Sequence, residues 1–383
     1  MILLGNNMKS SDEYVRQAIA VARYYGFLPV EAVLPTCKLT RRLPAPIPSS
    51  EKADKEFAAI MYSYIENGYA KLSQPSLLYH YTENPDSISF GLQVLGSGKS
   101  IAEAILLKTA LAILAETNTP KTCVYINGIG DRDSMQRFSR DLTAYLRKNI
   151  EDIPSHARQL MKKDPIAAYR DMLRKRHDIA LRAPNTIQFL TEASRSHLRE
   201  VLEYLEVAGV PYELDTNLVG YQDCHTRTFF EVREQNENED DEQTIFARGG
   251  RFDELGKRSF KTEVPAVNVT LTIEKKGRMS KKSLEPKQQR KPKVCFIQLG
   301  FDAKLRALNV IEELRLSKVP VYQALGHERL TDQLALAEEM HIPYAVIMGQ
   351  KEALENAVIV RNLDTRSQQT VPITMLPQHL KAL

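Results

Sequence analysis

The stretch KKGRMSKKSLEPKQQRKPK, residues 275–293, limits what this 383-residue chain can fold into more than any other feature. It carries nine Lys or Arg and a single Glu, with almost nothing apolar, so it cannot build a core of its own. The pattern of apolar residues differs on its two sides, which predicts a basic linker between two separate units. We therefore expect a core over residues 1–274 and a second domain over residues 294–383.

The core is predicted to contain an antiparallel sheet and a helical insertion. PSLLYHYTEN and SISFGLQVLG are two strand-like stretches separated by Asn84-Pro85-Asp86, which is typical of a β-hairpin. From about residue 131 to 208 the pattern is helical instead, and Arg and Lys are frequent. Further strands are predicted at GFLPVEAVLPT before the hairpin and, after the insertion, at PYELDTNLV, TRTFFEVRE, TIFARGG and AVNVTLTIE.

After residue 293 strands and helices alternate in short units such as VCFIQL and AKLRALNVIEELRLS. Alternation of this kind favours a mostly parallel sheet covered by helices on both faces. The expected fold class is therefore α/β, with an α+β core and an appended α/β module.

The stretch GLQVLGSGKS, residues 91–100, ends like the phosphate-binding P-loop of an ATPase. A P-loop needs a Gly six residues before Lys99, because that Gly lets the loop curl its N–H groups around phosphate. That position is Gln93. An ordinary strand, turn and helix explain the same stretch, since a buried strand precedes it and IAEAILLKTALAILAE follows it.

Composition narrows the classes of function. No apolar run reaches the length of a membrane span and MILLGNNMKS is too short for a signal peptide, so we expect a cytoplasmic protein with no membrane partner. The cysteines lie far apart without a CxxC pair, which indicates neither a disulfide framework nor a metal site. They are expected to be buried small hydrophobes: Cys37, Cys123, Cys224 and Cys295.

Three longer stretches follow one another in a distinctive order. YELDTNLVGYQDCHTRTFFEV precedes ARGGRFDEL, and the C-terminal module contains LALAEEMHIPYAVIMGQKEALENAVIVRNLDTRSQQTVP. Together they resemble histidyl-tRNA synthetase, a class II aminoacyl-tRNA synthetase, over nearly the whole chain. The resemblance implies a class II antiparallel sheet, a helical insertion that starts at VYINGIGDRDSMQRF, and an anticodon-binding C-terminal domain. Gly-Ser-Gly-Lys-Ser is then a coincidental turn, because class II enzymes hold ATP on the sheet with arginines.

The resemblance also implies which residues should activate histidine, and two of them differ here. Activation of an amino acid by ATP needs cations on the phosphates, usually Arg with Mg²⁺ beside it. The family's α-phosphate arginine corresponds to His80, and Lys275 stands where the motif 3 helix should end in Gly-Leu-Glu-Arg. Lys can act near phosphate as a point charge, so activity that uses ATP and Mg²⁺ stays open.

The substrate pocket implied by the resemblance differs as well. Gln93 stands where the family has the Glu that binds the substrate amino group, and Ser89 where it has the Gln partner. The family's Arg-Gly-Leu-Asp-Tyr-Tyr is Gly-Tyr-Gln-Asp-Cys-His here, residues 220–225, which keeps the Asp and loses the Arg and both Tyr. We expect the remnants of the pocket to be Ser89, Gln93, Asp223, His225 and Arg227.

Other residues match the scaffold of the family. GGRFDEL resembles its Gly-Gly-Arg-Tyr-Asp-Gly-Leu turn, in which Arg251 and Asp253 are expected to hold the turn while Gly249 and Gly250 supply unusual backbone angles. Pro35 resembles the motif 1 proline at the dimer seam. The resemblance therefore implies a dimer, formed either with a second copy or with a true synthetase.

A retained scaffold with altered catalytic positions favours a paralogue without aminoacylation activity and without a cofactor, which binds tRNA, another RNA or a protein. The basic charges of the linker and the insertion are equally explained by a flexible spacer and a solvated helix face. Two alternatives stay open: an active histidine–tRNA ligase, and a regulatory subunit similar to that of ATP phosphoribosyltransferase, which generally lacks the anticodon-binding domain. The candidate phosphate contacts are Lys281, Lys282, Arg290 and Lys291.

Overall fold

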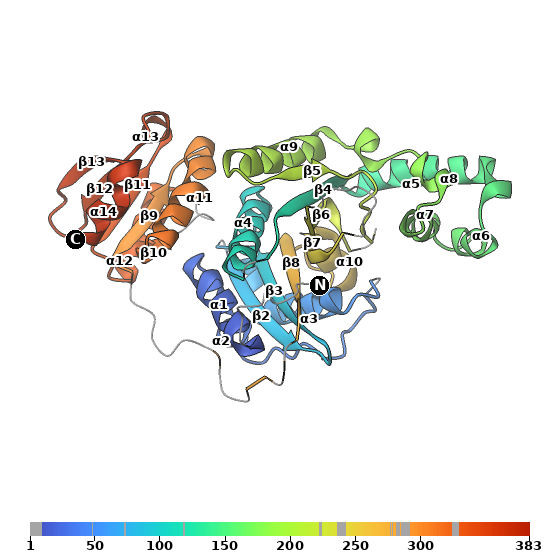
Figure 1. Cartoon of the computed structure of the whole chain (residues 1–383), viewed down its shortest axis with the longest axis horizontal. Helices are drawn as coiled ribbons and strands as arrows, with labels where there is room; N and C mark the ends of the chain where they lie inside the picture. The colour runs from blue at the N-terminus through green and yellow to red at the C-terminus, as the bar shows by residue number, and fades with distance from the viewer. Residues whose placement is uncertain are drawn as a thin grey trace.

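The computed structural model arranges the chain in three parts placed in a row (Figure 1). A sheet-based core lies in the middle, a C-terminal module lies at one end and a group of short helices lies at the other. The structure describes residues 10–47, 49–72, 74–117, 119–221, 224–235, 243–275, 277, 279–280, 284, 292–323 and 329–383.

The core is built on an eight-stranded sheet with the order β1-β2-β3-β8-β7-β6-β4-β5. Its neighbouring strands are antiparallel except for two pairs at the edges, β1 with β2 and β4 with β5, which are parallel. The predicted hairpin and the predicted antiparallel sheet are therefore confirmed. The strands are β1 Leu28–Pro29, β2 Ser76–Glu83, β3 Ser87–Leu95, β4 Thr122–Gly130, β5 Tyr212–Leu214, β6 Thr226–Glu234, β7 Ile245–Arg251 and β8 Ala266–Glu274.

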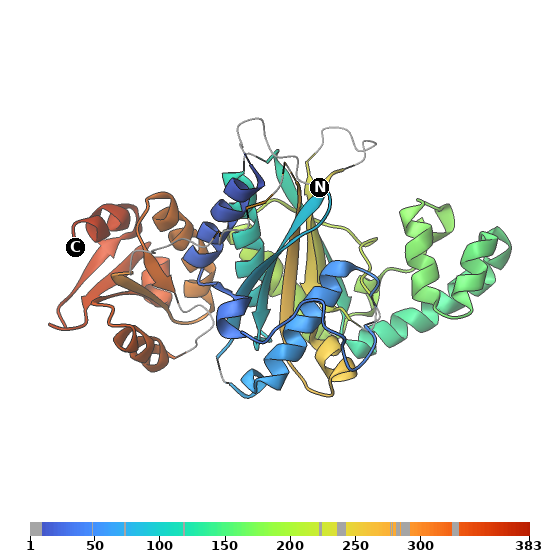
Figure 2. The same ribbon diagram turned by 90° about the horizontal axis from the view of Figure 1, so that it is seen from below.

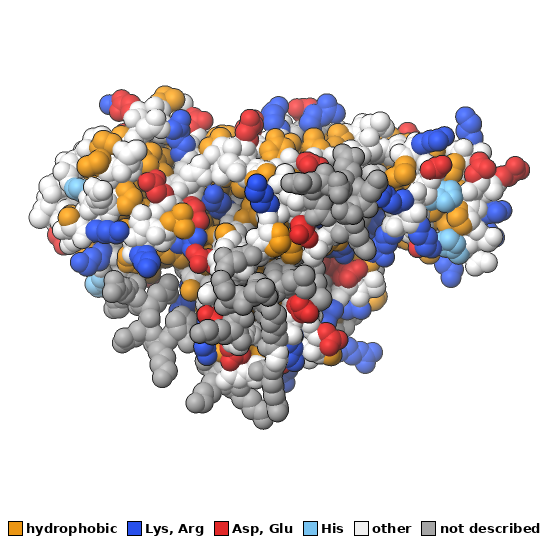
Figure 3. Space-filling view, in the orientation of Figure 1, with side chains coloured by type: hydrophobic (Ala, Val, Ile, Leu, Met, Phe, Trp, Pro, Cys, Tyr) orange, Lys and Arg blue, Asp and Glu red, His pale blue; other side chains and the backbone are white. Residues whose placement is uncertain are grey.

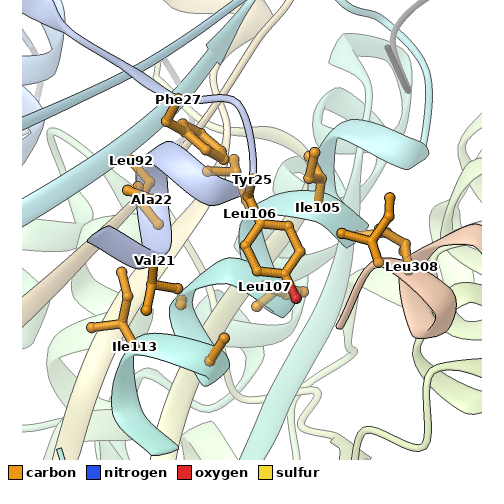
Figure 4. Close-up of a cluster of buried hydrophobic side chains, with 14 of the residues drawn as sticks. Val21, Ala22, Tyr25, Phe27, Leu92, Ile105, Leu106, Leu107, Ile113 and Leu308 are labelled. Carbon is orange, nitrogen blue, oxygen red and sulfur yellow. The ribbon is translucent and has the colours of Figure 1, made fainter. Parts of the chain in front are cut away.

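One face of this sheet is apolar and is covered by three helices. These are α1 (Ser11–Tyr24), α4 (Ile101–Glu116) and α9 (Glu192–Val207). Figure 4 shows how side chains from α1 and α4 meet between the helices, beside Leu92 of the sheet. Because α4 touches the sheet, α1 and α9, it is buried nearly all round, which explains its almost unbroken apolar sequence.

The opposite face is covered only in part. Helix α3 (Lys52–Glu66) and the short α10 (Asp253–Ser259) lie on it, on the side away from α1 and α4 (Figure 2). The group of short helices packs against the β4–β6 side of the sheet, around Tyr125 and Phe229. Since successive side chains of a strand point to opposite faces, the polar residues in the middle of this face lie between these two covers, and His80, Gln93 and Asn268 are buried there.

The helical insertion predicted over about residues 131–208 forms as a bundle of short helices. Asp131 caps the first helix by accepting a hydrogen bond from the Ser134 N–H at 2.9 Å. Asp164 caps another in the same way and is followed by Pro at the first helical position. The elements before α9 are α5 Arg132–Lys148, α6 Ser155–Met161, α7 Pro165–Arg174 and α8 Asp178–Leu181, with one-turn 3-10 helices at Ile150–Asp152 and Thr186–Phe189.

The C-terminal module is a five-stranded sheet with the order β10-β9-β11-β12-β13. Its first three strands are parallel, whereas β12 and β13 form an antiparallel ribbon at one edge. The expectation of a mostly parallel sheet is thus wrong for this edge, because β12 and β13 follow one another through a short turn. The elements are β9 Val294–Gln298, α11 Phe301–Leu316, β10 Val321–Gln323, α12 Leu330–Glu339, β11 Tyr344–Met348, α13 Gln350–Leu354, β12 Ala357–Asn362, β13 Gln368–Pro372, a 3-10 turn Ile373–Met375 and α14 Leu376–Lys381.

The module docks on the core through α11. The Tyr25 hydroxyl donates to the Glu312 carboxylate at 2.6 Å, and the Tyr24 hydroxyl donates to the Val319 carbonyl at 2.8 Å. Arg315 adds an ion pair with Glu116 at 2.7 Å. Since the apolar cluster of the core continues into α11, the two units share a packed interface.

The linker between the two units differs from its prediction in one respect. Met279 and Leu284 are buried against the main apolar cluster, and the Ser280 N–H donates to Asp12 at 3.0 Å. The linker is therefore attached to the core at these residues, although its composition predicts a fully solvated spacer.

Two predicted strands are shorter than expected. GFLPVEAVLPT forms only the two-residue β1 and then the single-turn helix α2 (Val30–Val33), which buries Val30 and leads to the buried Leu34. PYELDTNLV forms only β5. Pro29 ends β1 and is at the same time the N-cap of α2, whereas the turn-forming Asp215 follows β5 at once. A 3-10 turn over Tyr69–Lys71 follows α3.

Among the residues that the structure describes, no helix combines the length and the apolar character that crossing a membrane would require.

Candidate functional site

The polar face of the core sheet carries the positions that the sequence singles out. His80 on β2 pairs with Gly91 on β3, which pairs with Thr270 on β8. Gln93 on β3 pairs with Asn268 on β8. Directly paired residues point to the same face, so these side chains form one continuous floor.

The floor is polar, but it lacks the cationic side chains that phosphate binding needs. Along β2, β3 and β8 it carries an imidazole, amides and hydroxyls, and these three strands contain no Arg or Lys. The imidazole of His80 is 2% exposed and Gln93 is fully buried. The site that the resemblance assigns to ATP and histidine therefore has a buried floor without Arg or Lys.

His80 fills the space above Gly91. A Cβ atom added to Gly91 would lie 2.2 Å from His80 Cε1 and 2.7 Å from Nδ1, so only Gly leaves room for the ring. His80 Nδ1 forms a hydrogen bond with Gln93 Nε2 at 2.8 Å. The two altered positions are thus joined to each other, and the imidazole occupies the space between them.

Glu56, on α3, faces this imidazole and was not singled out by the sequence. Its Oε2 lies 3.8 Å from His80 Nε2, and its Oε1 lies 3.5 Å from the Lys52 ammonium. Burial acts to raise the pKa of Glu56, but His80 and Lys52 outweigh it and hold the pKa below its ordinary value. Neither carboxylate oxygen has a hydrogen-bond partner within the described part of the chain.

Gly220 and His225 belong to the second altered stretch, residues 220–225, and the ring of His225 lies against Gly220. A Cβ atom on Gly220 would lie 2.8 Å from His225 Cγ, so a larger side chain cannot stand at 220 while the ring keeps its place. The ring is held by Phe252 and Phe229, with centroids 4.3 and 4.7 Å away, and its Nδ1 accepts from the Tyr221 N–H at 3.0 Å. His225 is therefore a packed core residue, and its burial lowers its pKa.

The helical insertion reaches this region through α7. The guanidinium of Arg170 lies 3.6 Å from the centre of the Tyr221 ring, and the Tyr221 hydroxyl pairs with Ser50 at 2.9 Å. Burial lowers the pKa of Arg170. These contacts join the insertion to the core beside the floor.

Ser89 and Lys275 are both turned toward the tip of the β2–β3 hairpin. Ser89 accepts a hydrogen bond from Asn84 Nδ2 at 3.1 Å, and the Lys275 ammonium lies 2.6 Å from the Glu83 carboxylate. Lys275 follows directly on β8, which is the strand predicted for AVNVTLTIE, so no helix ends at Lys275 as one does in the family's motif 3. The strand runs to Glu274 because it pairs with β3 over its whole length, up to Ser87.

Arg251 is the most strongly bound charged residue near the site. It is fully buried and donates to Glu103 at 2.8 and 2.6 Å, to the Ser97 carbonyl at 2.9 Å and to the Lys99 carbonyl at 3.1 Å. Asp253 accepts from it at 3.3 Å and from the Ala266 N–H at 2.9 Å. Although burial opposes it, Arg251 together with His197 lowers the pKa of Glu103 far below its ordinary value.

The loop before α4 shows why GSGKS is not a phosphate cradle. It turns the carbonyls of Ser97 and Lys99 inward to Arg251, whereas a P-loop turns backbone N–H groups toward phosphate. The stretch forms a strand, a turn and a helix, which confirms the alternative to the P-loop interpretation.

Gly249 and Gly250 have a different role from the one expected. Neither has a positive φ, and both lie inside β7. A Cβ atom on Gly249 would lie 2.2 Å from the Asn268 carbonyl oxygen, and one on Gly250 would lie 2.7 Å from that of Thr228. Close approach of neighbouring backbones, and not an unusual backbone angle, requires glycine here.

Arg227 does have an unusual backbone, with φ at 58°. Its guanidinium donates to the Gly98 carbonyl at 3.3 Å and lies at the same distance from His197 Nδ1. His197 in turn contacts Glu103 at 2.7 Å. Arg227 thus belongs to the charged network around Glu103 and not to the floor around His80.

Five predicted site residues lie outside the described residues: Asp223, Lys281, Lys282, Arg290 and Lys291. Within the described ranges, no cluster of three or more His, Cys, Asp or Glu stands ready to hold a metal ion. Sequence reasoning missed three residues: Glu103 and Asn268 are polar residues inside apolar stretches, whereas Glu56 follows the charged run at the start of α3. Burial of these polar side chains would have identified them, but burial can be predicted only when the pairing of the strands is known.

Comparison with known proteins gives the relationships of the chain. The family model described as the anticodon binding domain matches residues 293–383. The histidine–tRNA ligase of Staphylococcus saprophyticus is 25% identical over 337 residues, which cover 85% of this chain and 80% of the relative. That of Halalkalibacterium halodurans is 25% identical over 338 residues, which cover 85% and 78%. The crystal structure of apo S. aureus histidyl-tRNA synthetase matches with a TM-score of 0.51 at 18% identity, over 100% of both chains.

The large antiparallel sheet with its helical insertion and the appended anticodon-binding module define a class II aminoacyl-tRNA synthetase fold. Within this class, the chain is similar in sequence to histidine–tRNA ligases over 85% of its length. The predictions of fold class and family are therefore confirmed.

Proposed function

We propose that this chain binds RNA and does not activate histidine. The observation that carries the proposal is the placement of His80, whose ring fills the space above Gly91 and pairs with the other altered position, Gln93, at 2.8 Å. The other ring nitrogen, Nε2, lies 3.8 Å from the carboxylate of Glu56, whose negative charge opposes a phosphate at this position. A neutral amide at position 93 also cannot neutralise a substrate ammonium as a carboxylate does.

The chemistry explains why these changes matter together. The transition state of amino acid activation concentrates negative charge on phosphate oxygens, and its stabilisation depends on cations fixed beforehand. Loss of one such donor costs about 10²- to 10³-fold in rate. His80 stands where the family has its α-phosphate arginine. Gly220 stands where the family has a second arginine, and a larger side chain does not fit there because the ring of His225 lies against it. These losses act on the same step and leave no useful rate.

RNA binding is supported by the anticodon-binding module and by the position of the positive charge. The module itself is nearly balanced, with nine Lys or Arg and ten Asp or Glu over residues 294–383. The insertion, residues 131–208, has fifteen against twelve, and Figure 3 shows both signs interspersed at its end of the molecule. The linker has nine against one, so it is the strongest attraction for a polyanion.

Binding of tRNA at two salt concentrations tests this assignment. If the linker contacts phosphates, log affinity falls with log salt by about 0.7 for each phosphate neutralised on a single strand. Replacing Lys281, Lys282, Arg290 and Lys291 with Gln should flatten this slope and weaken binding of all sequences alike.

A matched variant removes the same charge from the insertion, with Gln at Lys148, Lys162, Lys163 and Arg176, which are all exposed. We expect a smaller change in slope for it than for the linker variant. Absence of binding at low salt, or equal slopes for the linker variant and the unchanged chain, would reject the linker as an RNA contact and favour a protein partner.

A second candidate is an active histidine–tRNA ligase, which the names of the similar proteins favour. It would need ATP and Mg²⁺, and Lys275 would have to supply the missing positive charge. The 2.6 Å ion pair between Lys275 and Glu83 opposes this, because it partly neutralises the ammonium. Exchange of pyrophosphate into ATP separates the two candidates.

We further propose that the chain works as a dimer. The edge of the core sheet supports this, since β1 has a strand on one side only and Leu28 within it is half exposed. Pro35, the motif 1 proline of the resemblance, is exposed close by in sequence. Sedimentation of the chain as a monomer at micromolar concentration would count against the dimer.

A further inference from the structure

A hollow of about 590 Å³ lies between the start of α3 and the loop of residues 39–47. Its walls include Leu43, Pro46 and Ile47 from the loop, and Lys52, Lys55 and Glu56 from one side of the helix. The three helical residues are three and four positions apart, so they share a face of α3. The hollow is large enough for a small organic molecule.

Glu56 is the buried charge of this hollow, and its ion pairs with Lys52 and His80 are long. The residue is 2% exposed, and both of its carboxylate oxygens are without a hydrogen bond among the described residues. A buried carboxylate whose hydrogen-bonding capacity is unmet costs folding free energy. The ammonium of Lys52 at 3.5 Å and the imidazole of His80 at 3.8 Å both lie farther away than the about 2.7–2.9 Å of a good charge-assisted hydrogen bond.

Lys52 shows what kind of group this carboxylate accepts. Its side chain is 57% exposed, and its ammonium also contacts the Asn84 side chain at the hairpin tip. It reaches Glu56 from solvent across the mouth of the hollow, one helical turn away. A ligand with its own cationic group can replace the ammonium of Lys52 without unfolding any part of the chain.

The remaining lining residues determine the other end of such a ligand. Arg42 and Lys55 line the hollow, and both are exposed. Arg41 is engaged instead by Glu66 at 2.5 Å. A ligand whose buried end is a cation would therefore meet free positive charge at the rim, which favours an anion at its other end. The apolar loop residues suit a short aliphatic connection between the two ends.

We propose that this hollow binds a small zwitterion, whose guanidinium or ammonium pairs with Glu56 and whose carboxylate lies against Arg42 and Lys55. A guanidinium fits the carboxylate best, because its planar fork can satisfy both oxygens at once. The role of Glu56 does not follow from the histidine pocket of the family, whose positions here are Ser89, Gln93 and residues 220–225. The site is independent of RNA binding.

Calorimetric titration of the full chain with 4-guanidinobutyrate tests the proposal. We expect binding that weakens about tenfold or more in Glu56→Gln, because a charge-assisted pair becomes a neutral contact. Glu338→Gln removes an exposed carboxylate from α12 and should bind as the unchanged chain does. Butylguanidine lacks the carboxylate and should bind more weakly than 4-guanidinobutyrate.

Two further variants keep the test sharp if Glu56→Gln folds poorly. Lys52→Ala removes the competing ammonium and should tighten binding, whereas Arg42→Ala with Lys55→Ala should weaken it. The proposal is overturned if no heat of binding is found with 4-guanidinobutyrate up to about 10 mM. A dissociation constant of that size corresponds to a binding free energy of about 3 kcal/mol. The proposal is also overturned if Glu56→Gln binds as tightly as Glu338→Gln, or if Lys52→Ala weakens binding. Binding of tRNA is measured separately and should be the same in Glu56→Gln as in the unchanged chain. The zwitterion proposal and the RNA proposal can therefore fail independently of each other.

Discussion

Substitution of Gly91 by Ala tests directly whether the His80 ring fills the site. The added methyl carbon would lie 2.2 Å from His80 Cε1, whereas carbon atoms in contact stay about 3.5–4.0 Å apart. The ring must therefore move by more than an ångström. It is 2% exposed and held by Gln93 at 2.8 Å, so it cannot move into solvent without losing that hydrogen bond.

The magnitude follows from these two effects. Overpacking of a filled interior costs about 1–3 kcal/mol, and loss of the hydrogen bond adds about 1 kcal/mol. We therefore expect the free energy of unfolding to fall by about 2–4 kcal/mol, which for a core of about 270 residues corresponds to a melting temperature lower by about 3–7 °C. Circular dichroism follows the melting well, since the chain has no Trp and Tyr fluorescence alone is weak.

Two matched variants show whether His80 is the cause. A Cβ atom on Gly98 would meet only Pro265, at an ordinary 3.8 Å, so Gly98→Ala should leave the melting temperature nearly unchanged. In the double variant His80→Ala with Gly91→Ala, the clash is removed, and the double change should cost less than the sum of the single changes. A neutral Gly91→Ala, or strictly additive effects, would refute the placement of the ring.

Three more predictions concern the buried charges and the domain contact. Arg251→Met leaves the carboxylate of Glu103 buried without its main partner and should lower the free energy of unfolding by about 3–5 kcal/mol in thermal denaturation; a change below about 1 kcal/mol would contradict the buried pair. Burial lowers the pKa of His225, so the unfolded chain, with a His pKa near about 6.5, takes up a proton that the folded chain excludes. Stability should therefore fall as the pH drops from about 7 to 5, and His225→Phe should reduce this loss in melting curves; an unchanged slope would contradict the assignment. Tyr25→Phe removes the hydrogen bond to the Glu312 carboxylate and should weaken docking of the C-terminal module by about 1–3 kcal/mol, seen as faster proteolysis of the linker; an unchanged rate would contradict it.

Much of the fold can be predicted from the chain alone, because its signals are local. Asn84-Pro85-Asp86 marks the β2–β3 hairpin, and the change to helical spacing after residue 130 marks the insertion. The short β1 was harder to predict. The apolar run that suggests a longer strand is shared there between a two-residue strand and one helical turn, and only packing of Val30 and Leu34 decides between them.

The site depends on contacts that no local pattern reveals. His80 was singled out as an altered position, but its partner Glu56 lies on another element, and the closeness of the two follows from how α3 lies on the sheet. The glycines at 249 and 250 were expected to matter for their backbone angles. Their true constraint is the distance to β6 and β8, which depends on the pairing of strands distant in sequence.

The charge of the linker is visible in the sequence, yet its attachment to the core is not. Met279 and Leu284 are isolated apolar residues in a polar stretch, and such residues give no periodic signal. Their burial ties part of the linker to the core cluster.

Exchange of labelled pyrophosphate into ATP in the presence of histidine tests the central claim most directly, because it measures activation without any tRNA. The assay should include a histidine–tRNA ligase of the family as the positive control, at equal concentration and with Mg²⁺ in excess. With His80 buried against Gln93 and Gly220 closed by His225, we expect no exchange that depends on histidine. Histidine-dependent exchange at a rate near that of the control would show that the floor opens to ATP and would contradict the account.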